Sequence, residues 1–325
     1  MTAQQMRSPT PEGVARAAAK IADLLPRTPL LETEIHGHSV WIKAESLQPI
    51  GAFKIRGAWH RLSDLTEEER ARGVVGVSSG NHAQGVAWAA RRLGIAATIV
   101  MPVDAPAVKL AATRALGAEV VLYDRPGGED RDELARRLCA ERGATLVHAY
   151  ADPWVIEGQG SAGTEIIAQM AERGMRPPTR VIVCCGGGGL TAGLALACPD
   201  AEIIPVEPEG WDDVCRSLAT GTIQRVMADA PATACDSLQT PATFPINFAI
   251  LKERCMHGVA VTPAEVRAAQ RFAFSALHLV VEPGGAVALA AALAGKVPLD
   301  GRTAILVTGS NTDPADFAKV LASTD

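Results

Sequence analysis

Seven short runs of apolar, mostly β-branched residues recur along the chain, and each predicts a buried strand. They span residues 74–77, 97–101, 119–123, 144–149, 180–184, 202–206 and 304–308. Between many of them lie amphipathic stretches such as HAQGVAWAARRLG and RDELARRLCAERG, which are typical of helices. Apolar strands that alternate with helices indicate an α/β fold, with a mainly parallel sheet covered on both faces.

Two local patterns near the N-terminus add detail to this picture. Thr10-Pro11 precedes an alanine-rich stretch, which predicts a helix with a threonine N-cap and a proline in its first position. The histidines at 36 and 38 have no further metal-ligand spacing around them, and we interpret the pair as a surface turn.

The composition is that of an ordinary soluble globular protein. Of 325 residues, 48% are hydrophobic and 21% charged, and the length suggests one large or two medium domains. A net charge of −5 without a basic stripe argues against a nucleic-acid partner. No apolar run reaches the roughly 18–20 residues of a membrane helix, and the N-terminus lacks a signal-peptide core. We therefore expect a cytoplasmic protein without a membrane partner.

The seven cysteines support the same compartment. They are odd in number, scattered, and include no C-x-x-C pair, which favours reduced core thiols over a disulfide framework or a zinc site. They are Cys139, Cys184, Cys185, Cys198, Cys215, Cys235 and Cys255.

The segment GAFKIRGA (51–58) holds the most unusual lysine of the chain. Lys54 follows an aromatic residue, sits between two glycines and comes shortly after a proline. A surface lysine needs no such setting. Partial desolvation lowers the pKa of a lysine and frees its amine as a nucleophile, so the segment predicts an imine-forming lysine.

Three corners rich in small residues follow predicted strands. They are SSGNH (78–82), GGGGL (186–190) and TGSN (308–311). Small residues at the start of a helix expose backbone N–H groups that bind anions, although the first corner could also be only a capped turn. Ligands gather beyond the carboxyl ends of parallel strands, so the three corners and Lys54 together predict one site.

Two further patterns each leave an alternative open. Gly187-x-Gly189-x-x-Ala192, with Glu207 about 20 residues on, satisfies a dinucleotide fingerprint and keeps a nicotinamide-dependent oxidoreductase in play. The segment EPEGWDD (207–213) places four carboxylates within seven residues. Hard cations prefer such oxygen ligands, but a solvated acidic turn has the same composition.

Six ordered motifs together resemble the fold-type II pyridoxal phosphate (PLP) enzymes, in the threonine/serine dehydratase and serine racemase group. The motifs are ESLQPIGAFKIRGA, SSGNHAQG, GGGGL, VEP, VEPGGAVALAA and TGSN, and they cover essentially the whole chain. The resemblance implies a tryptophan synthase β-like fold of two open, twisted, mainly parallel sheets. It also implies a small domain at 73–151, a large domain made of 1–72 and 152–325, PLP between them, and a homodimer.

The resemblance also assigns roles to individual residues. It implies that Lys54 carries PLP through an imine and that the other cofactor contacts are Phe53, Asn81, Gly186, Gly187, Gly188, Gly189, Leu190, Glu282 and Thr308. Within this set the glycines and Leu190 cradle the phosphate, Asn81 bonds the phenolic oxygen and Thr308 faces the pyridine nitrogen. The substrate carboxylate is expected at Ser78, Asn81 and His82. Glu282 could instead be a buried structural carboxylate.

The activity implied is β-elimination from an amino-acid substrate. A 3-hydroxy amino acid (L-threonine, L-serine or 3-hydroxyaspartate) would lose its α-proton to Lys54 and its hydroxyl as water, giving a 2-oxo acid and ammonia. A neutral hydroxyl at Thr308 strengthens the ring as an electron sink less than a carboxylate does, which favours prompt loss of the leaving group.

Two residues bear on which activity and which substrate within this group the protein has. Ser79 stands where serine racemases carry a second base, so an amino-acid racemase using Lys54 and Ser79 is the main alternative; Ser79 could equally be a helix cap. Arg131 aligns with an arginine that meets a second carboxylate, which would favour 3-hydroxyaspartate, or it could be an exposed charge. A non-catalytic PLP-binding relative is a further alternative.

The resemblance extends to a cation site. Relatives bind a divalent cation through residues that correspond to Glu207, Asp213 and the carbonyl of Trp211, so Mg²⁺ or Ca²⁺ is expected here in a structural role. Asp236-Ser237 departs from the Asp-Gly that is common beside the cofactor, and residues 240–244 depart from the racemase pattern.

Overall fold

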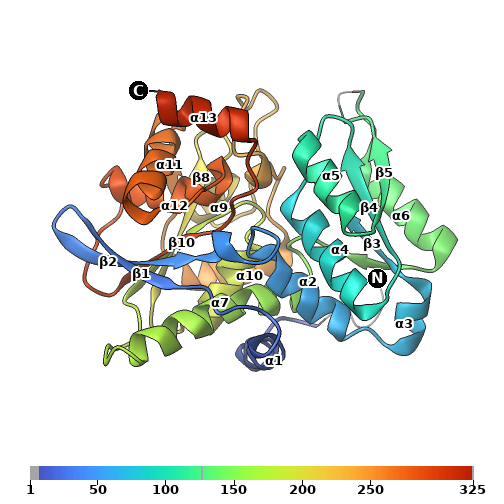
Figure 1. Cartoon of the computed structure of the whole chain (residues 1–325), viewed down its shortest axis with the longest axis horizontal. Helices are drawn as coiled ribbons and strands as arrows, with labels where there is room; N and C mark the ends of the chain where they lie inside the picture. The colour runs from blue at the N-terminus through green and yellow to red at the C-terminus, as the bar shows by residue number, and fades with distance from the viewer. Residues whose placement is uncertain (1–6, 126, 324–325) are drawn as a thin grey trace.

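The computed structural model describes residues 7–125 and 127–323 and contains two sheets (Figure 1). The larger has the strand order β1-β2-β10-β7-β8-β9, and the smaller has the order β5-β4-β3-β6. The strands are β1 (Leu30–Ile35), β2 (His38–Ala44), β3 (Val74–Val77), β4 (Ala97–Pro102), β5 (Glu119–Tyr123), β6 (Thr145–Val147), β7 (Arg180–Cys184), β8 (Glu202–Pro208), β9 (Val259–Val261) and β10 (Thr303–Val307).

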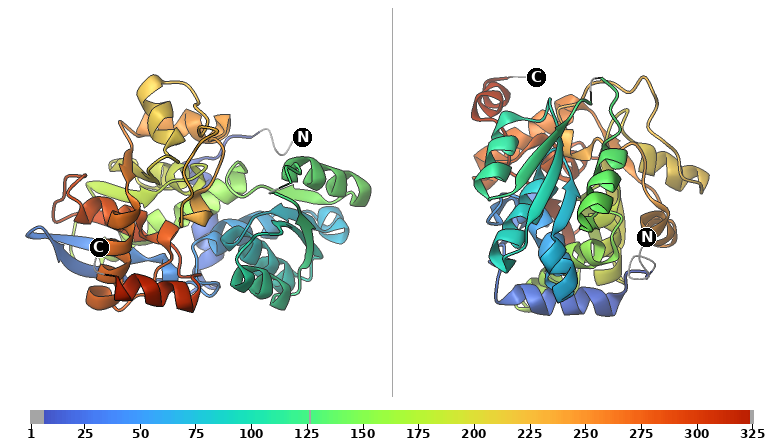
Figure 2. Two further views of the ribbon diagram at one scale, coloured as in Figure 1. Left: turned by 90° about the horizontal axis from the view of Figure 1, so that it is seen from above. Right: turned by 90° about the vertical axis from the view of Figure 1, so that its right-hand side faces the viewer.

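Helices cover the faces of both sheets, as Figure 2 shows from two further sides. They are α1 (Pro11–Ala22), α2 (Lys54–Ser63), α3 (Glu67–Arg72), α4 (Asn81–Leu93), α5 (Ala107–Ala115), α6 (Arg131–Arg142), α7 (Pro153–Ala171), α8 (Gly189–Ala197), α9 (Asp213–Thr220), α10 (Pro245–Arg254), α11 (Pro263–Leu277), α12 (Pro283–Leu293) and α13 (Pro314–Ala322). Every strand pairing is parallel except that of β1 with β2. The predicted fold class is confirmed.

The central strands are buried on both faces, as their continuous apolar runs predict. Val181, Ile182 and Val183 of β7 are fully buried, and so are Ile305 and Leu306 of β10. Since a strand with apolar residues on both faces needs cover on both, helices pack on either side of the sheet.

The predicted helix start near the N-terminus is also confirmed. The Thr10 side chain accepts a hydrogen bond from the backbone N–H of Gly13 at 3.0 Å, and Pro11 is the first residue of α1. All seven cysteines are free thiols, and five of them are buried. In the described ranges no helix is both long and apolar enough to cross a membrane.

The sequence prediction missed three strands. The hairpin of β1 and β2 turns at His36 and Gly37, both with positive φ (53° and 77°), so the surface turn is present but joins two strands. Only the two end residues of β1 are buried, and half-buried and exposed residues alternate between them. The prediction sought continuous apolar runs and therefore passed it over. The third missed strand, β9, has only three residues.

The smaller sheet does not stand apart from the rest of the chain. One hydrophobic cluster joins Val74 and Ile99 of this sheet with Ile55 and Leu62 of α2 and Ile21 of α1. The helix that begins at Lys54 therefore packs in the region where the two sheets approach each other (Figure 1). The exact division at 73–151 stays a prediction.

Candidate active site

A cavity of about 280 Å³ opens where several strands end. Its wall includes the corners after β3, β7 and β10 and the start of α2. The predicted residues that line it are Phe53, Lys54, Ser78, Ser79, Asn81, His82, Arg131, Gly186, Gly187, Gly188, Gly189, Leu190, Glu282 and Thr308. The structure thus brings together every residue predicted for catalysis, cofactor or substrate.

Lys54 is the first residue of α2, and the two residues that follow β10 hold the chain just before it. The backbone N–H of Phe53 donates to the carbonyl of Thr308 at 3.1 Å, and Ala52 forms a bridge with Gly309. The Lys54 Nζ donates to the carbonyl of Ala149 at 2.7 Å. Burial lowers the pKa of Lys54 to about 8, as expected for a desolvated amine.

This pKa predicts a pH dependence for the reaction of Lys54 with an aldehyde. Only the neutral amine attacks, so the rate of PLP capture by the protein freed of cofactor should rise about tenfold per pH unit below pH ~7.5 and level off above ~8.5. Stopped-flow absorbance from pH 6 to 10 measures it. A rate that still climbs steeply at pH 10 would mean an ordinary, solvated lysine.

The loop of four glycines leads into α8, whose first residue is Gly189, and it lines the cavity. In the described ranges, no protein acceptor bonds the N–H groups of Gly187, Gly188, Gly189 or Leu190. These groups add to the positive end of the α8 dipole, a setting that suits a phosphate. Position 188 requires a glycine because its φ of 86° is one that residues with a side chain rarely adopt.

Two glycines of this loop are also required by a neighbouring aromatic side chain. A Cβ on Gly187 would lie 2.2 Å from the Tyr150 ring, and one on Gly189 would lie 2.9 Å from the Tyr150 Cα. Sequence reasoning assigned all four glycines to a phosphate, whereas Tyr150 by itself already excludes side chains at these two positions.

A chain of polar contacts crosses the cavity wall at Asn81. Its amide nitrogen donates to Glu282, and its amide oxygen accepts from the Asn311 Nδ2 at 2.9 Å. Lys109 lies 2.7 Å from Asp236 and 3.2 Å from Glu282. Burial raises the pKa of Glu282, and Lys109 opposes that shift. Sequence reasoning gave no role to Lys109, which stands in an ordinary local pattern, and none to Asn311, although Asn311 ends the TGSN corner (308–311).

The corner at residues 78–82 leaves the start of α4 open to a ligand. Gly80 is the N-cap residue, and no side chain caps the helix, so the alternatives of a capped turn and of Ser79 as a helix cap are wrong. The Ser78 hydroxyl accepts from the Gly80 N–H at 3.1 Å. His82 donates from Nε2 to the Val147 carbonyl at 3.0 Å, and burial lowers its pKa to about 3. The imidazole is therefore neutral.

Further polar and aromatic side chains line the same cavity. Arg131, the first residue of α6, lines the cavity with 32% of its side chain exposed. The His148 Nδ1 accepts from the N–H of Ala151 at 2.9 Å, and burial, with Arg131 and Lys54 nearby, lowers the His148 pKa to about 4. The ring packs edge-on against Tyr150 and Phe244. Sequence reasoning assigned no role to His148, Tyr150 or Phe244.

The wall also offers polar atoms that fit a bound cofactor. The buried His82 Nδ1 and Thr240 Oγ1 lack a hydrogen-bond partner in the described part of the chain. The Thr308 hydroxyl is buried and lies 3.3 Å from the Cys184 Sγ. A nucleophilic lysine, an open phosphate cradle and unpaired buried polar atoms together suit PLP.

Glu207 and Asp213 lie outside the cavity wall. Each Glu207 carboxylate oxygen accepts one backbone N–H at the start of α9, from Val214 at 3.1 Å and from Cys215 at 2.7 Å. Glu207 is fully buried, so it cannot receive a ribose, which removes the acidic partner of the dinucleotide fingerprint. Within the described residues, no group of three or more His, Cys, Asp or Glu side chains could hold a metal.

Comparison with known proteins agrees with this geometry. The model of the family "Pyridoxal-phosphate dependent enzyme" matches residues 21–309. An L-threo-3-hydroxyaspartate ammonia-lyase from a Pseudomonas species is 42% identical over 95% of this chain and 97% of its own. The serine racemase of Schizosaccharomyces pombe is 38% identical over 97% and 98%.

Solved structures give the same result. A threonine deaminase from T.th. has a TM-score of 0.85 at 42% identity, covering 94% of this chain and 99% of its own. Maize serine racemase has a TM-score of 0.89 at 32% identity, covering 96% and 97%. The resemblance drawn from the motifs is confirmed: this chain belongs to the pyridoxal-phosphate dependent enzymes, in the group of threonine/serine dehydratases and serine racemases.

Proposed function

We propose that the protein is an ammonia-lyase that eliminates water from L-threo-3-hydroxyaspartate. The observation that carries the proposal is the presence of two carboxylate-binding features in the cavity that holds Lys54: the open start of α4, and Arg131. A substrate with one carboxylate needs only the first. The 42% identical ammonia-lyase, named for the same amino acid, supports the choice.

The cofactor proposed for this site is PLP, which supplies an electron sink for the α-carbanion. Lys54 would hold it covalently beside Phe53, and the N–H groups of residues 186–190 would bind its phosphate. Asn81 would donate to the phenolic oxygen, in place of its present donation to Glu282. Thr308 would face the ring nitrogen.

The residues of the chain would then act as follows. The substrate α-carboxylate binds the backbone N–H groups around Ser78, Asn81 and His82, and the distal carboxylate pairs with Arg131. Lys54, released on substrate binding, takes the α-proton as general base. The β-hydroxyl would leave as water when it takes up a proton, which the Lys54 ammonium formed in the preceding step can return, and hydrolysis of the resulting enamine would give a 2-oxo acid and ammonia.

A racemase remains the second candidate, because Ser79 lines the same cavity and does not cap α4. Racemisation needs a proton donor on the face opposite Lys54, and the Ser79 hydroxyl could supply it. In the Ser79→Ala variant we expect 2-oxo acid formation within about threefold of wild type and no D-isomer. Chiral chromatography and an oxo-acid assay on one sample measure both. A dominant D-isomer in the wild type, lost in this variant, would instead favour the racemase.

We further propose two domains, at 73–151 and in the remainder, that close on the substrate, in a cytoplasmic homodimer. The placement of the cavity between residues of both sheets supports domain closure. The family resemblance carries the homodimer, and the seven free cysteines support the compartment.

We also propose a structural Mg²⁺ or Ca²⁺ held by Glu207, Asp213 and the Trp211 carbonyl. Burial raises the pKa of Asp213 to about 7, and burial together with Asp213 raises the pKa of Glu207. Two buried carboxylates that resist ionisation side by side suit a cation that neutralises both.

The raised pKa values fix the sign of a pH effect on stability. Without a cation, native Asp213 keeps a proton that the unfolded chain releases above pH ~4, so stability falls as pH rises from ~4 to about 7, and the raised pKa of Glu207 acts in the same direction. A cation competes with those protons. Millimolar Mg²⁺ or Ca²⁺ should therefore raise Tm by about 3–5 °C at pH 8 and by less than ~1 °C at pH 5. An equal increase in Tm at pH 8 and pH 5 would contradict the site. So would an increase in the Asp213→Asn variant as large as that in the wild type.

A further inference from the structure

A cofactor held covalently at one end and by its phosphate at the other requires a fixed distance between the two attachment points. In this chain the first point begins α2, at Lys54, and the second begins α8, at the glycine loop. One helix, α7, packs extensively against both α2 and α8.

The two helix crossings are too close for any side chain. A Cβ on Gly158 of α7 would lie 2.5 Å from the Gly57 Cα of α2. Half a turn further along α7, a Cβ on Gly160 would lie 2.5 Å from the Gly193 carbonyl oxygen of α8. Backbone thus rests on backbone at both crossings, and the thickness of one helix separates α2 from α8.

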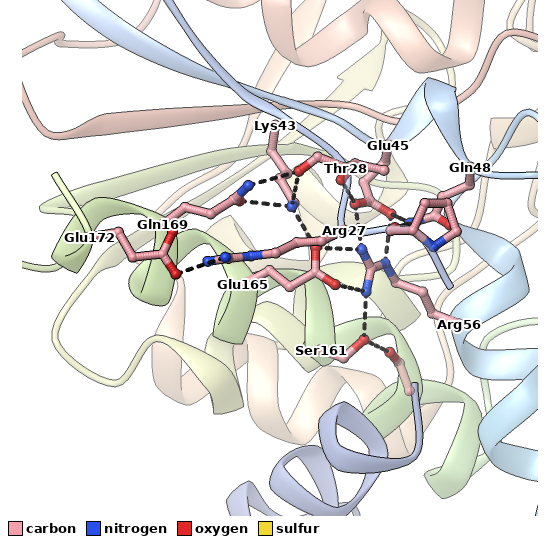
Figure 3. Close-up of polar contacts among 12 residues, drawn as sticks. Arg27, Thr28, Lys43, Glu45, Gln48, Arg56, Ser161, Glu165, Gln169 and Glu172 are labelled. Carbon is pink, nitrogen blue, oxygen red and sulfur yellow. Dashed lines mark hydrogen bonds and ion pairs between the residues drawn. The ribbon is translucent and has the colours of Figure 1, made fainter. Parts of the chain in front are cut away.

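Arg56, two residues after Lys54, fastens α2 to α7 at the same place (Figure 3). Its guanidinium is fully buried and binds two carboxylates with two hydrogen bonds each: Glu45 at 2.7 and 2.8 Å, and Glu165 of α7 at 2.8 Å twice. Its Nη1 also donates to Ser161 of α7 at 3.2 Å. The five N–H groups of Arg56 are therefore all used, in a geometry that lysine cannot reproduce.

The same cluster is electrically balanced. Lys43 of β2 is fully buried, and its Nζ donates to Glu165 at 2.6 Å and to Gln169 at 2.9 Å. Two cations and two carboxylates thus neutralise each other in a cluster of which only Glu165 is partly exposed. A buried charge that loses its partner is strongly unfavourable, so the cluster holds one arrangement.

We infer that α7 sets the distance between Lys54 and the phosphate cradle, and that Arg56 is the positioning residue that keeps α2 in register on it. The inference rests on the placement of the cofactor proposed above. Arg56 touches neither cofactor nor substrate. It acts through the first turn of α2, which has no side-chain cap of its own.

The test compares a ligand that spans both points with one that reaches only the first. PLP carries the phosphate and pyridoxal does not, so the dissociation constant of pyridoxal divided by that of PLP reports how well the two points match. Visible absorbance of the imine and mass after borohydride reduction measure both ligands on the full chain. Arg56→Lys should lower this ratio at least about tenfold, while competition by inorganic phosphate stays unchanged.

Arg61→Lys is the matched control. Arg61 is also buried on α2 and pairs with Asp152 through one hydrogen bond at 3.1 Å, but it lies two turns from Lys54. Its ratio should stay within about twofold of wild type. If Arg56→Lys does not fold, Glu165→Gln replaces it as the test variant. It keeps the ion pair of Arg56 with Glu45 and should lower the ratio in the same direction. An unchanged ratio in the folded variant would overturn the inference, whereas a wild-type protein without an imine at Lys54 would overturn the proposed function instead.

Discussion

Replacing Lys54 by alanine should reduce product formation by at least about 10³-fold with every amino acid tested. The variant loses both the covalent attachment of the cofactor and the base that takes the α-proton. The fold should survive, because the Lys54 Nζ makes a single hydrogen bond, to the Ala149 carbonyl, and no ion pair in the described part of the chain. Oxo-acid assays, with thermal denaturation alongside, measure the two effects.

A small primary amine provides the control for this variant. Added ethylamine can replace the missing amine in the cavity of about 280 Å³ and should restore part of the activity. Restoration would show that the loss is chemical and does not come from misfolding. Full activity in Lys54→Ala without added amine would contradict the assignment of this lysine.

Arg131→Ala should separate the candidate substrates. The variant should lose about 100-fold in kcat/KM for L-threo-3-hydroxyaspartate, on the order of 3 kcal/mol for a lost charge-assisted pair. L-serine has no second carboxylate, so its kcat/KM should change by less than about threefold. Steady-state kinetics with both substrates give the comparison.

Arg136→Ala is the matched control for Arg131. Arg136 lies on the same helix and also lines the cavity. Its loss should affect hydroxyaspartate by less than about tenfold, through long-range attraction only. An equal loss in both variants, or an equal loss of serine and hydroxyaspartate in Arg131→Ala, would mean that Arg131 does not bind the distal carboxylate.

Much of the fold and of the site could be predicted from the sequence, because the strands, the corners and the unusual lysine are each recognised from neighbouring residues alone. The parallel strands are short apolar runs, and the corners after β3, β7 and β10 are runs of small residues whose place at strand ends follows from the sheet. Lys54 stood out for the same reason, since its immediate neighbours are unusual.

What the sequence could not predict depends on contacts between distant segments. Gly187 is small because Tyr150, 37 residues earlier, packs against it. Lys109 reaches Asp236 and Glu282 across the cavity from an ordinary helix. Arg56 looks like any charged helix residue until Glu45 and Glu165 surround it. None of these partners follows from periodicity or composition.

The most direct test of the account is a comparison of kcat/KM for oxo-acid formation by the wild-type protein with L-threo-3-hydroxyaspartate, L-threonine and L-serine. The account predicts the highest value for hydroxyaspartate, by at least about tenfold over the other two, because only this substrate uses both the α4 corner and Arg131. A higher value for threonine or serine would contradict the dicarboxylic substrate. Inversion of serine with no oxo acid from any of the three would contradict the elimination itself.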